Sequence, residues 1–182
     1  MGGITARVLY YPTLLFNVVM SKVSSRRWYD RIDSTVILGA LPFRGITKQL
    51  VEDENVRAVI TMNEEYETRF WVNNKEEWEA AGVEQLRLTT QDFVGTPSSE
   101  NVNKAVDFIY KYKEMNKSVY IHCKAGRTRS ATITACYLMK DNGWNPQTAY
   151  NFIKSKRSHI ILRQKQWNTL EDYYQSINES PR

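Results

Sequence analysis

The 182-residue chain contains only two cysteines and two histidines, together with eight glycines and five prolines. Two cysteines cannot build a disulfide framework, and the few Cys and His residues lack zinc-ligand spacing. We therefore expect a reducing compartment, no metal or other cofactor, and cysteine chemistry that depends on a single thiol. The low glycine and proline content and the 42% of hydrophobic residues exclude collagen-like and disordered chains and predict one folded domain.

Acidic residues are absent from the first 29 residues, which carry Arg7, Lys22, Arg26 and Arg27. These four positive charges make up most of the formal net charge of +5, so residues 30–182 contribute only +1. The rest of the chain is thus almost neutral, and it contains no motif that reads DNA or RNA. We expect no nucleic-acid partner.

A hydrophobic run long enough to cross a bilayer is also missing. The apolar run at residues 8–20 is thirteen residues long and is interrupted by Pro12 and Asn17, whereas a membrane-spanning helix needs about 20 residues. A basic, acid-free and partly apolar start is typical of a mitochondrial presequence or a membrane anchor. We therefore predict a tail at residues 1–29 that targets the protein or associates with a membrane, and a folded domain at residues 30–182. The alternative is an apolar first helix packed on that domain.

Short apolar segments alternate with segments of helical periodicity after the tail. We predict strands at residues 35–38, 56–62, 85–88 and 118–121. Helices are predicted at residues 46–54, 75–81, 101–113 and 128–140, with a further one that starts at Asn145-Pro146. The polar segments at residues 63–67 and 91–99 are predicted loops. Such alternation indicates an α/β fold with a mainly parallel central sheet flanked by helices, whose sites lie at the carboxyl ends of the strands.

Cys123 follows the predicted strand at residues 118–121 and precedes a predicted helix. Backbone N–H groups of the intervening loop can converge on one point, Gly126 permits a positive φ there, and the helix adds its positive N-terminal end. Such a cradle fits a tetrahedral phosphate and lowers the pKa of a cysteine, so we expect Cys123 to be a thiolate near neutral pH. The predicted phosphate-binding residues are Lys124, Ala125, Gly126, Arg127, Thr128 and Arg129.

Three neighbours of Cys123 are candidates for a part in the chemistry. The planar guanidinium of Arg129 can bind two phosphate oxygens at once. The hydroxyl of Ser130 can donate a hydrogen bond to the thiolate, and His122 can brace the loop backbone. Cys136, by contrast, lies among apolar residues of a predicted helix, and we interpret it as a core residue.

Other interpretations of Cys123 remain open at this point. A cysteine after a strand is often a small buried hydrophobe, and the Cys-x5-Arg spacing alone arises by chance. The full string HCKAGRTRS between a strand and a helix favours a phosphate site. Such a site can also belong to a phosphate-binding module without turnover. Sulfur transferases present a cysteine on an anion-binding loop too, but Arg129 followed by Ser130 favours phosphoryl transfer.

Residues 122–130, HCKAGRTRS, resemble the signature loop of the cysteine-dependent phosphatases of the dual-specificity type. The resemblance implies the fold of that family and a metal-free reaction in which Cys123 forms a phosphocysteine intermediate. It also implies an Asp on an upstream loop that protonates the leaving alcohol and then activates water. Asp92, 31 residues before Cys123, is the candidate, although the Trp and Pro that many tyrosine phosphatases carry around this Asp are absent.

Basic residues favour a substrate with more than one negative charge. Lys124 and Arg127 lie inside the loop and resemble the basic positions of lipid and inositol-phosphate phosphatases. Residues 154–165, KSKRSHIILRQK, carry five Lys and Arg residues without an acid and can dock on an anionic lipid surface. The alternative for this segment is a helix end with a solvated basic face and a buried apolar centre.

Residues 63–67 (NEEYE), residues 157–160 (RSHI) and the acid-free tail together resemble the mitochondrial lipid phosphatases of this family, which act on phosphatidylglycerophosphate in cardiolipin biosynthesis. The resemblance implies this anionic phospholipid as substrate and the matrix side of the mitochondrial inner membrane as location. We expect a monomer that works at a membrane surface. The resemblance also places Glu64 and Tyr66 beside the site, where a carboxylate of residues 64–67 holds Arg129 or another basic side chain and Tyr66 lines the entrance. A protein tyrosine or serine phosphatase and a phosphoinositide phosphatase remain the alternatives.

Overall fold

The computed structural model describes residues 2–24, 26–91 and 95–179. Within this part of the chain, five strands form one sheet in the order β1-β2-β5-β3-β4. Strands β2, β5, β3 and β4 run parallel, and β1 pairs with β2 in the antiparallel direction at one edge. Their bounds are β1 Tyr29–Arg31, β2 Val36–Gly39, β3 Val56–Thr61, β4 Glu84–Arg87 and β5 Ser118–His122. The predicted α/β fold with a mainly parallel central sheet is confirmed.

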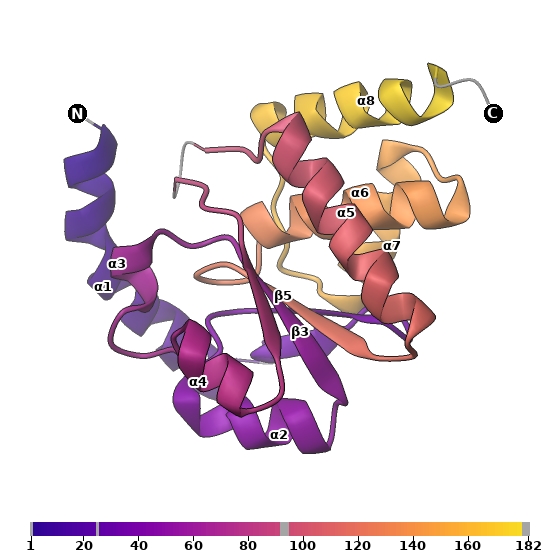
Figure 1. Ribbon diagram of the computed structural model, residues 1–182. Helices are drawn as coiled ribbons and strands as arrows, with labels where there is room; N and C mark the ends of the chain where they lie inside the picture. The colour runs from indigo at the N-terminus through magenta and orange to yellow at the C-terminus, as the bar shows by residue number, and fades with distance from the viewer. Residues whose placement is uncertain (1, 25, 92–94, 180–182) are drawn as a thin grey trace.

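Helices cover both faces of this sheet (Figure 1). On one side lie α5 (Ser99–Glu114), α6 (Arg129–Asn142), α7 (Pro146–Lys156) and α8 (Gln164–Glu179). The other side is covered by α1 (Gly2–Val23), α2 (Thr47–Glu52) and α4 (Lys75–Ala80). Two short pieces complete the described elements, the 3-10 turn η1 (Arg44–Ile46) and α3 (Glu65–Thr68).

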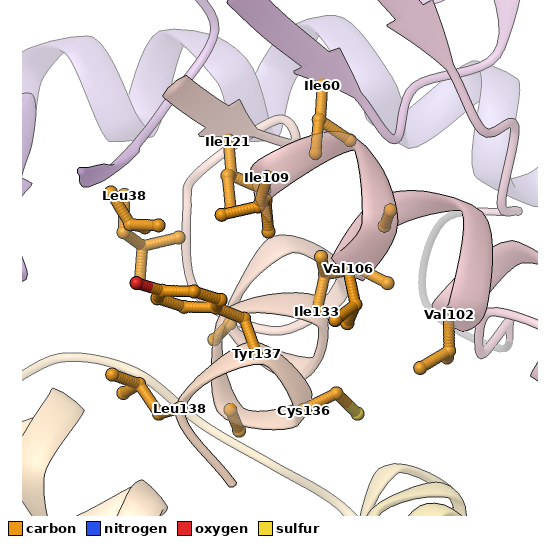
Figure 2. Close-up of a cluster of buried hydrophobic side chains, with 14 of the residues drawn as sticks. Leu38, Ile60, Val102, Val106, Ile109, Ile121, Ile133, Cys136, Tyr137 and Leu138 are labelled. Atoms are coloured by element: carbon orange, nitrogen blue, oxygen red, sulfur yellow. The ribbon is translucent and has the colours of Figure 1, made fainter. Parts of the chain in front are cut away.

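The side chains of the central strands alternate between two buried cores. In β5, Val119 and Ile121 contribute to the core under α5 and α6, whereas Tyr120 contributes to the core under α1, α2 and α4. Figure 2 shows Ile121 of β5 beside Ile109 of α5 in the first of these cores. Burial on both faces is what a parallel sheet between two helical layers requires. Cys136 is fully buried in the first core, which confirms its interpretation as a core residue.

The first helix packs on the domain instead of standing apart from it. Tyr10 and Leu14 of α1 are buried in the second core, in the same cluster as Ile37 of β2 and Trp78 of α4. The sequence left such a packed helix open as an alternative, and the targeting or membrane-associating role of residues 1–29 stays a prediction. No helix in the described ranges has the length and apolar character that a membrane span requires.

The structure differs from the sequence-based expectation in a few places. Residues 63–67, predicted as a loop, include the start of the helical turn α3, in which the backbone N–H of Glu64 donates to the carboxylate of Glu67 at 2.8 Å. Strand β1 and helix α8 were not predicted, because β1 has three residues and α8 follows the basic segment without a capping signal. The other predicted strands and helices are found within about three residues of their expected bounds.

Candidate active site

The loop at residues 123–128 connects β5, in the middle of the sheet, to the N-terminus of α6. Gly126 adopts a φ of +63°, the positive region that a glycine permits at this point of the cradle. A Cβ atom at this position would lie 2.4 Å from the carbonyl group of Gly39 at the end of β2. Only glycine therefore combines this backbone conformation with such a close approach of the loop to the sheet.

Cys123 stands at the bottom of this loop with 4% of its surface exposed. The hydroxyl of Ser130 donates a hydrogen bond to the sulfur over 3.2 Å. Burial by itself raises the pKa of the thiol, but the charge of Arg129, the Ser130 hydroxyl and the backbone N–H groups of Ser130 and Arg127 outweigh it. Together they hold the pKa of Cys123 below its ordinary value. The site therefore favours a thiolate, which is the nucleophilic form of cysteine.

The hydrogen bond from Ser130 yields a pH-dependent prediction. Removing the hydroxyl in Ser130→Ala raises the pKa of Cys123, because one of the groups that stabilise the thiolate is lost. The thiolate then forms only at higher pH, so the acid limb of the kcat/KM profile moves upward. We expect kcat/KM on that limb to fall by about tenfold, because the free energy of a hydrogen bond to a charged group corresponds to a change of about this size. Steady-state kinetics from pH 4.5 to 8 measure the position of the acid limb. The matched control is Ser155→Ala, at an exposed position. An acid limb that does not move in Ser130→Ala contradicts the role of the Ser130 hydroxyl in stabilising the thiolate.

Arg129 is held in the site by a buried ion pair with Glu67. Its Nη1 and Nη2 atoms donate to the two carboxylate oxygens over 2.9 and 3.1 Å, and both side chains are almost fully buried. Nη1 also donates to the backbone carbonyl groups of Met62 and Thr90. This bidentate geometry fixes the plane of the guanidinium, which lines the pocket beside Cys123.

The carboxylate that holds Arg129 is thus Glu67, whereas the sequence singled out Glu64 and left the choice within residues 64–67 open. Glu64 is half-buried at the N-terminal end of α3, where its backbone N–H binds Glu67. Tyr66, expected at the entrance, instead packs edge-on against Tyr10 of α1, with 5.7 Å between ring centroids. The helical turn of α3 causes both differences, because it turns Glu67 toward Arg129 and Tyr66 toward α1.

His122 is fully buried at the end of β5, directly before the loop, and the bracing of the loop backbone by its side chain stays a prediction. Its Nε2 atom shares a hydrogen bond of 3.0 Å with the hydroxyl of Thr61 on the neighbouring strand β3. Burial lowers its pKa to about 3, so the imidazole is neutral at physiological pH. A neutral ring links the ends of two strands without adding a charge beneath Cys123.

A pocket of about 300 Å³ opens above Cys123. Five of the six predicted phosphate-binding residues line it, and Gly126 shapes the loop from below. The remaining walls come from two segments that lie far apart in the sequence, α1 and the stretch that follows α7. The lining residues are Thr13, Phe16, Cys123, Lys124, Ala125, Arg127, Thr128, Arg129, Ile161 and Arg163.

The basic segment at residues 154–165 supports the loop from behind as well as lining the pocket. Arg157 is buried, donates to the carbonyl groups of Gly126 and Ala125 over 2.8 and 3.1 Å, and pairs with Asp30 over 2.7 Å. At the other end of the loop, the backbone N–H of Ile161 donates to the carbonyl group of Arg127, and the carbonyl group of Ile161 accepts from the Thr128 hydroxyl. The sequence pointed to this segment only as a lipid-docking surface or a solvated helix end. Residues 157–160 contributed to the resemblance, but nothing in the sequence indicated that Arg157 binds the carbonyl groups of the loop.

Asp92, the candidate general acid, lies outside the described residues. The described residues on either side of it are tied to the site. The carbonyl group of Thr90 accepts from Arg129 over 2.8 Å, and the carbonyl group of Gly95 accepts from Gln166 of α8 over 3.1 Å. The role of Asp92 therefore stays a prediction.

Three comparisons with known proteins agree with this geometry. Residues 42–176 match the family model of the dual specificity phosphatase catalytic domain. The human protein Phosphatidylglycerophosphatase and protein-tyrosine phosphatase 1 is 53% identical over 175 residues, which cover 94% of this chain and 87% of that protein. Phosphatidylglycerophosphate phosphatase PTPMT1 of Arabidopsis thaliana is 40% identical, over 94% of this chain and 50% of that protein. The crystal structure of PTPMT1 in complex with PI(5)P, 52% identical, has a TM-score of 0.82 and covers 83% of this chain and 97% of that one.

Proposed function

The chain belongs to the dual-specificity phosphatase family, and from this premise we propose that it hydrolyses phosphatidylglycerophosphate to phosphatidylglycerol and phosphate. The observation that carries the proposal is the combination of one activated thiol with a cationic and apolar pocket. Cys123 and Arg129 serve any phosphomonoester, whereas Lys124 and the apolar rim select a lipid with additional negative charge. The names of the human and Arabidopsis relatives support this choice of substrate.

The reaction proceeds in two displacements at phosphorus. The Cys123 thiolate attacks the phosphomonoester, an S–P bond forms, and the P–O bond to the glycerol alcohol breaks. Asp92 gives its proton to the departing alkoxide and then, as a carboxylate, takes a proton from the water that cleaves the phosphocysteine. Arg129 and the backbone N–H groups of residues 124–129 hold the phosphoryl oxygens in both steps, while Glu67 fixes the plane of Arg129.

The rim of the pocket is suited to a lipid headgroup. Phe16 of α1 is 54% exposed and Ile161 is 45% exposed, and both line the pocket that holds the cationic loop. Arg127 and Arg163 lie on the same pocket. A phospholipid phosphate can therefore reach Cys123 while its glycerol and acyl region contacts apolar side chains, an arrangement that a soluble phosphopeptide does not need.

Helix α1 supports a location at a membrane surface. Leu15, Phe16 and Val19 form an exposed apolar face on this helix, within a segment that holds basic and no acidic residues. Apolar residues insert at the acyl boundary, and Lys and Arg are attracted to anionic lipid headgroups. We assign the enzyme, as a monomer, to the matrix side of the mitochondrial inner membrane on the basis of this helix and the substrate.

A substrate panel tests the proposal. Phosphate release is measured in parallel from phosphatidylglycerophosphate, phosphatidylinositol 5-phosphate and a phosphotyrosine peptide, with the lipids presented in vesicles of one composition. We expect kcat/KM for phosphatidylglycerophosphate to exceed the other values by about tenfold or more. Preference for the inositol lipid or for the peptide overturns the substrate assignment and keeps the mechanism. No release from any of the three overturns the enzymatic proposal itself.

A further inference from the structure

The structure brings α1 into contact with the signature loop at Lys124. The ammonium group of Lys124 donates a hydrogen bond to the hydroxyl of Thr13 over 2.9 Å and lies 5.4 Å from the ring centroid of Tyr10. Lys124 follows Cys123 directly in the chain and is 95% buried. Its charged end is therefore packed between the pocket and the first helix, although 111 residues separate Thr13 from Lys124 in the sequence.

Helix α1 is held in place next to Lys124 by the buried side chain of Tyr10. Tyr10 is fully buried, and its hydroxyl donates to the backbone carbonyl of Glu67 over 2.6 Å. One turn further on, Thr13 lines the pocket together with Lys124. The helix is thus tied to α3 on one side, and it presents the Thr13 hydroxyl to Lys124 from a fixed position.

A lysine side chain has several freely rotating bonds, and without a partner its ammonium group samples many positions. A hydroxyl at fixed distance and an aromatic face restrict it to one of them. Lys124 and Thr13 both line the pocket above Cys123, so the restricted position keeps the positive charge beside bound substrate. Phosphatidylglycerophosphate carries a phosphodiester besides the phosphate that is cleaved, and this second anion needs a cation of its own.

We propose that Thr13 is a positioning residue that holds the ammonium group of Lys124 beside the pocket for the second anionic group of the lipid substrate. The inference rests on the proposed function, since it assigns a residue to the recognition of that substrate. It makes α1 a part of the substrate site as well as a membrane-facing helix. The enzyme that acts on the lipid then needs residues 10–13 in place.

The test is Thr13→Val, which keeps the β-branched shape and removes the hydroxyl. We expect KM for phosphatidylglycerophosphate to rise by about three- to tenfold, with kcat within twofold, because an interaction with a non-reacting part of the substrate is lost. For p-nitrophenyl phosphate, which has no second anion, both constants stay within twofold. Thr13→Ser restores the lipid KM because it restores the hydroxyl. Thr148→Val, at an exposed position of α7, is the matched control.

A double-variant cycle separates positioning from a merely structural effect. Lys124→Met raises the lipid KM, and adding Thr13→Val raises it no further, because the two residues act through one interaction. A full additional effect of Thr13→Val in the Lys124→Met background overturns the inference, as does an equal rise of KM for p-nitrophenyl phosphate. Unchanged lipid kinetics in Thr13→Val with an active wild type also overturn it. A wild type without activity on the lipid overturns the proposed function, and the inference with it.

Discussion

Replacing Cys123 by serine is expected to lower kcat by about 10⁴-fold or more, to the background of the assay. Arg129, the Ser130 hydroxyl and the loop N–H groups outweigh burial and lower the pKa of the Cys123 thiol, which favours the thiolate. A serine hydroxyl starts from a far higher pKa, so the same surroundings leave it protonated and weakly nucleophilic. The anion cradle itself is untouched, and inorganic phosphate still binds to the variant. Phosphate release and isothermal titration with phosphate measure the two effects separately.

Cys136→Ser provides the matched control for this substitution. Cys136 is fully buried on α6 in the core that Figure 2 shows, where burial raises the pKa of its thiol. A hydroxyl in this apolar place lowers the free energy of unfolding by about 1–3 kcal/mol and leaves kcat of the folded enzyme as it is. Residual turnover of Cys123→Ser above about a hundredth of the wild-type rate would falsify the phosphocysteine mechanism.

The sequence predicted the part of the site that is built by local structure. Cys123, Gly126 and Arg129 lie in one short stretch between a strand and a helix, so their mutual geometry follows from the βα connection alone. The positive φ of Gly126 and the lowered pKa of Cys123 are of this kind. The alternating apolar segments likewise predicted the sheet, because strands buried on both faces leave a clear pattern.

The contacts between the loop and segments that are distant in the sequence could not be predicted from local sequence patterns. Glu67 holds Arg129 only because residues 65–68 form a helical turn, and three neighbouring carboxylates looked equivalent in the sequence. Thr13 meets Lys124 because α1 packs on the domain, an arrangement that the sequence offered only as an alternative and without naming any contact. Contacts over such separations depend on tertiary packing, for which one sequence carries no periodic signal.

Arg157→Met is expected to lower the free energy of unfolding by about 3–5 kcal/mol and the melting temperature by about 6–20 °C. Arg157 and Asp30 form an ion pair of 2.7 Å in which both side chains are almost fully buried, and removal of the guanidinium leaves the carboxylate with exposed Arg27 as its remaining cation. The carbonyl groups of Ala125 and Gly126 lose their donors as well. Thermal unfolding followed by circular dichroism measures the change.

The exposed pair between Arg44 and Glu77 offers a matched control. Its N–O distance of 2.8 Å is nearly the same, but each side chain is more than 40% exposed. Solvent screens such a pair, so Arg44→Met changes the free energy of unfolding by less than about 1 kcal/mol. An equal loss of unfolding free energy in Arg157→Met and Arg44→Met would show that burial does not make the first ion pair more important for stability.

Measurements of kcat/KM distinguish the two roles of Arg157, which are to stabilise the fold and to hold the phosphate-binding loop in place. Its hydrogen bonds hold the loop that carries the phosphate-binding N–H groups, and a displacement of about 1 Å there lowers kcat/KM by about 100-fold. Adding Asp30→Leu to Arg157→Met removes the buried carboxylate that has lost its buried partner and restores much of the melting temperature. It supplies no donor for the Ala125 and Gly126 carbonyl groups, so kcat/KM stays low. Recovery of kcat/KM together with the melting temperature would mean that Arg157 acts on stability alone, because the double variant still lacks the hydrogen bonds to the loop.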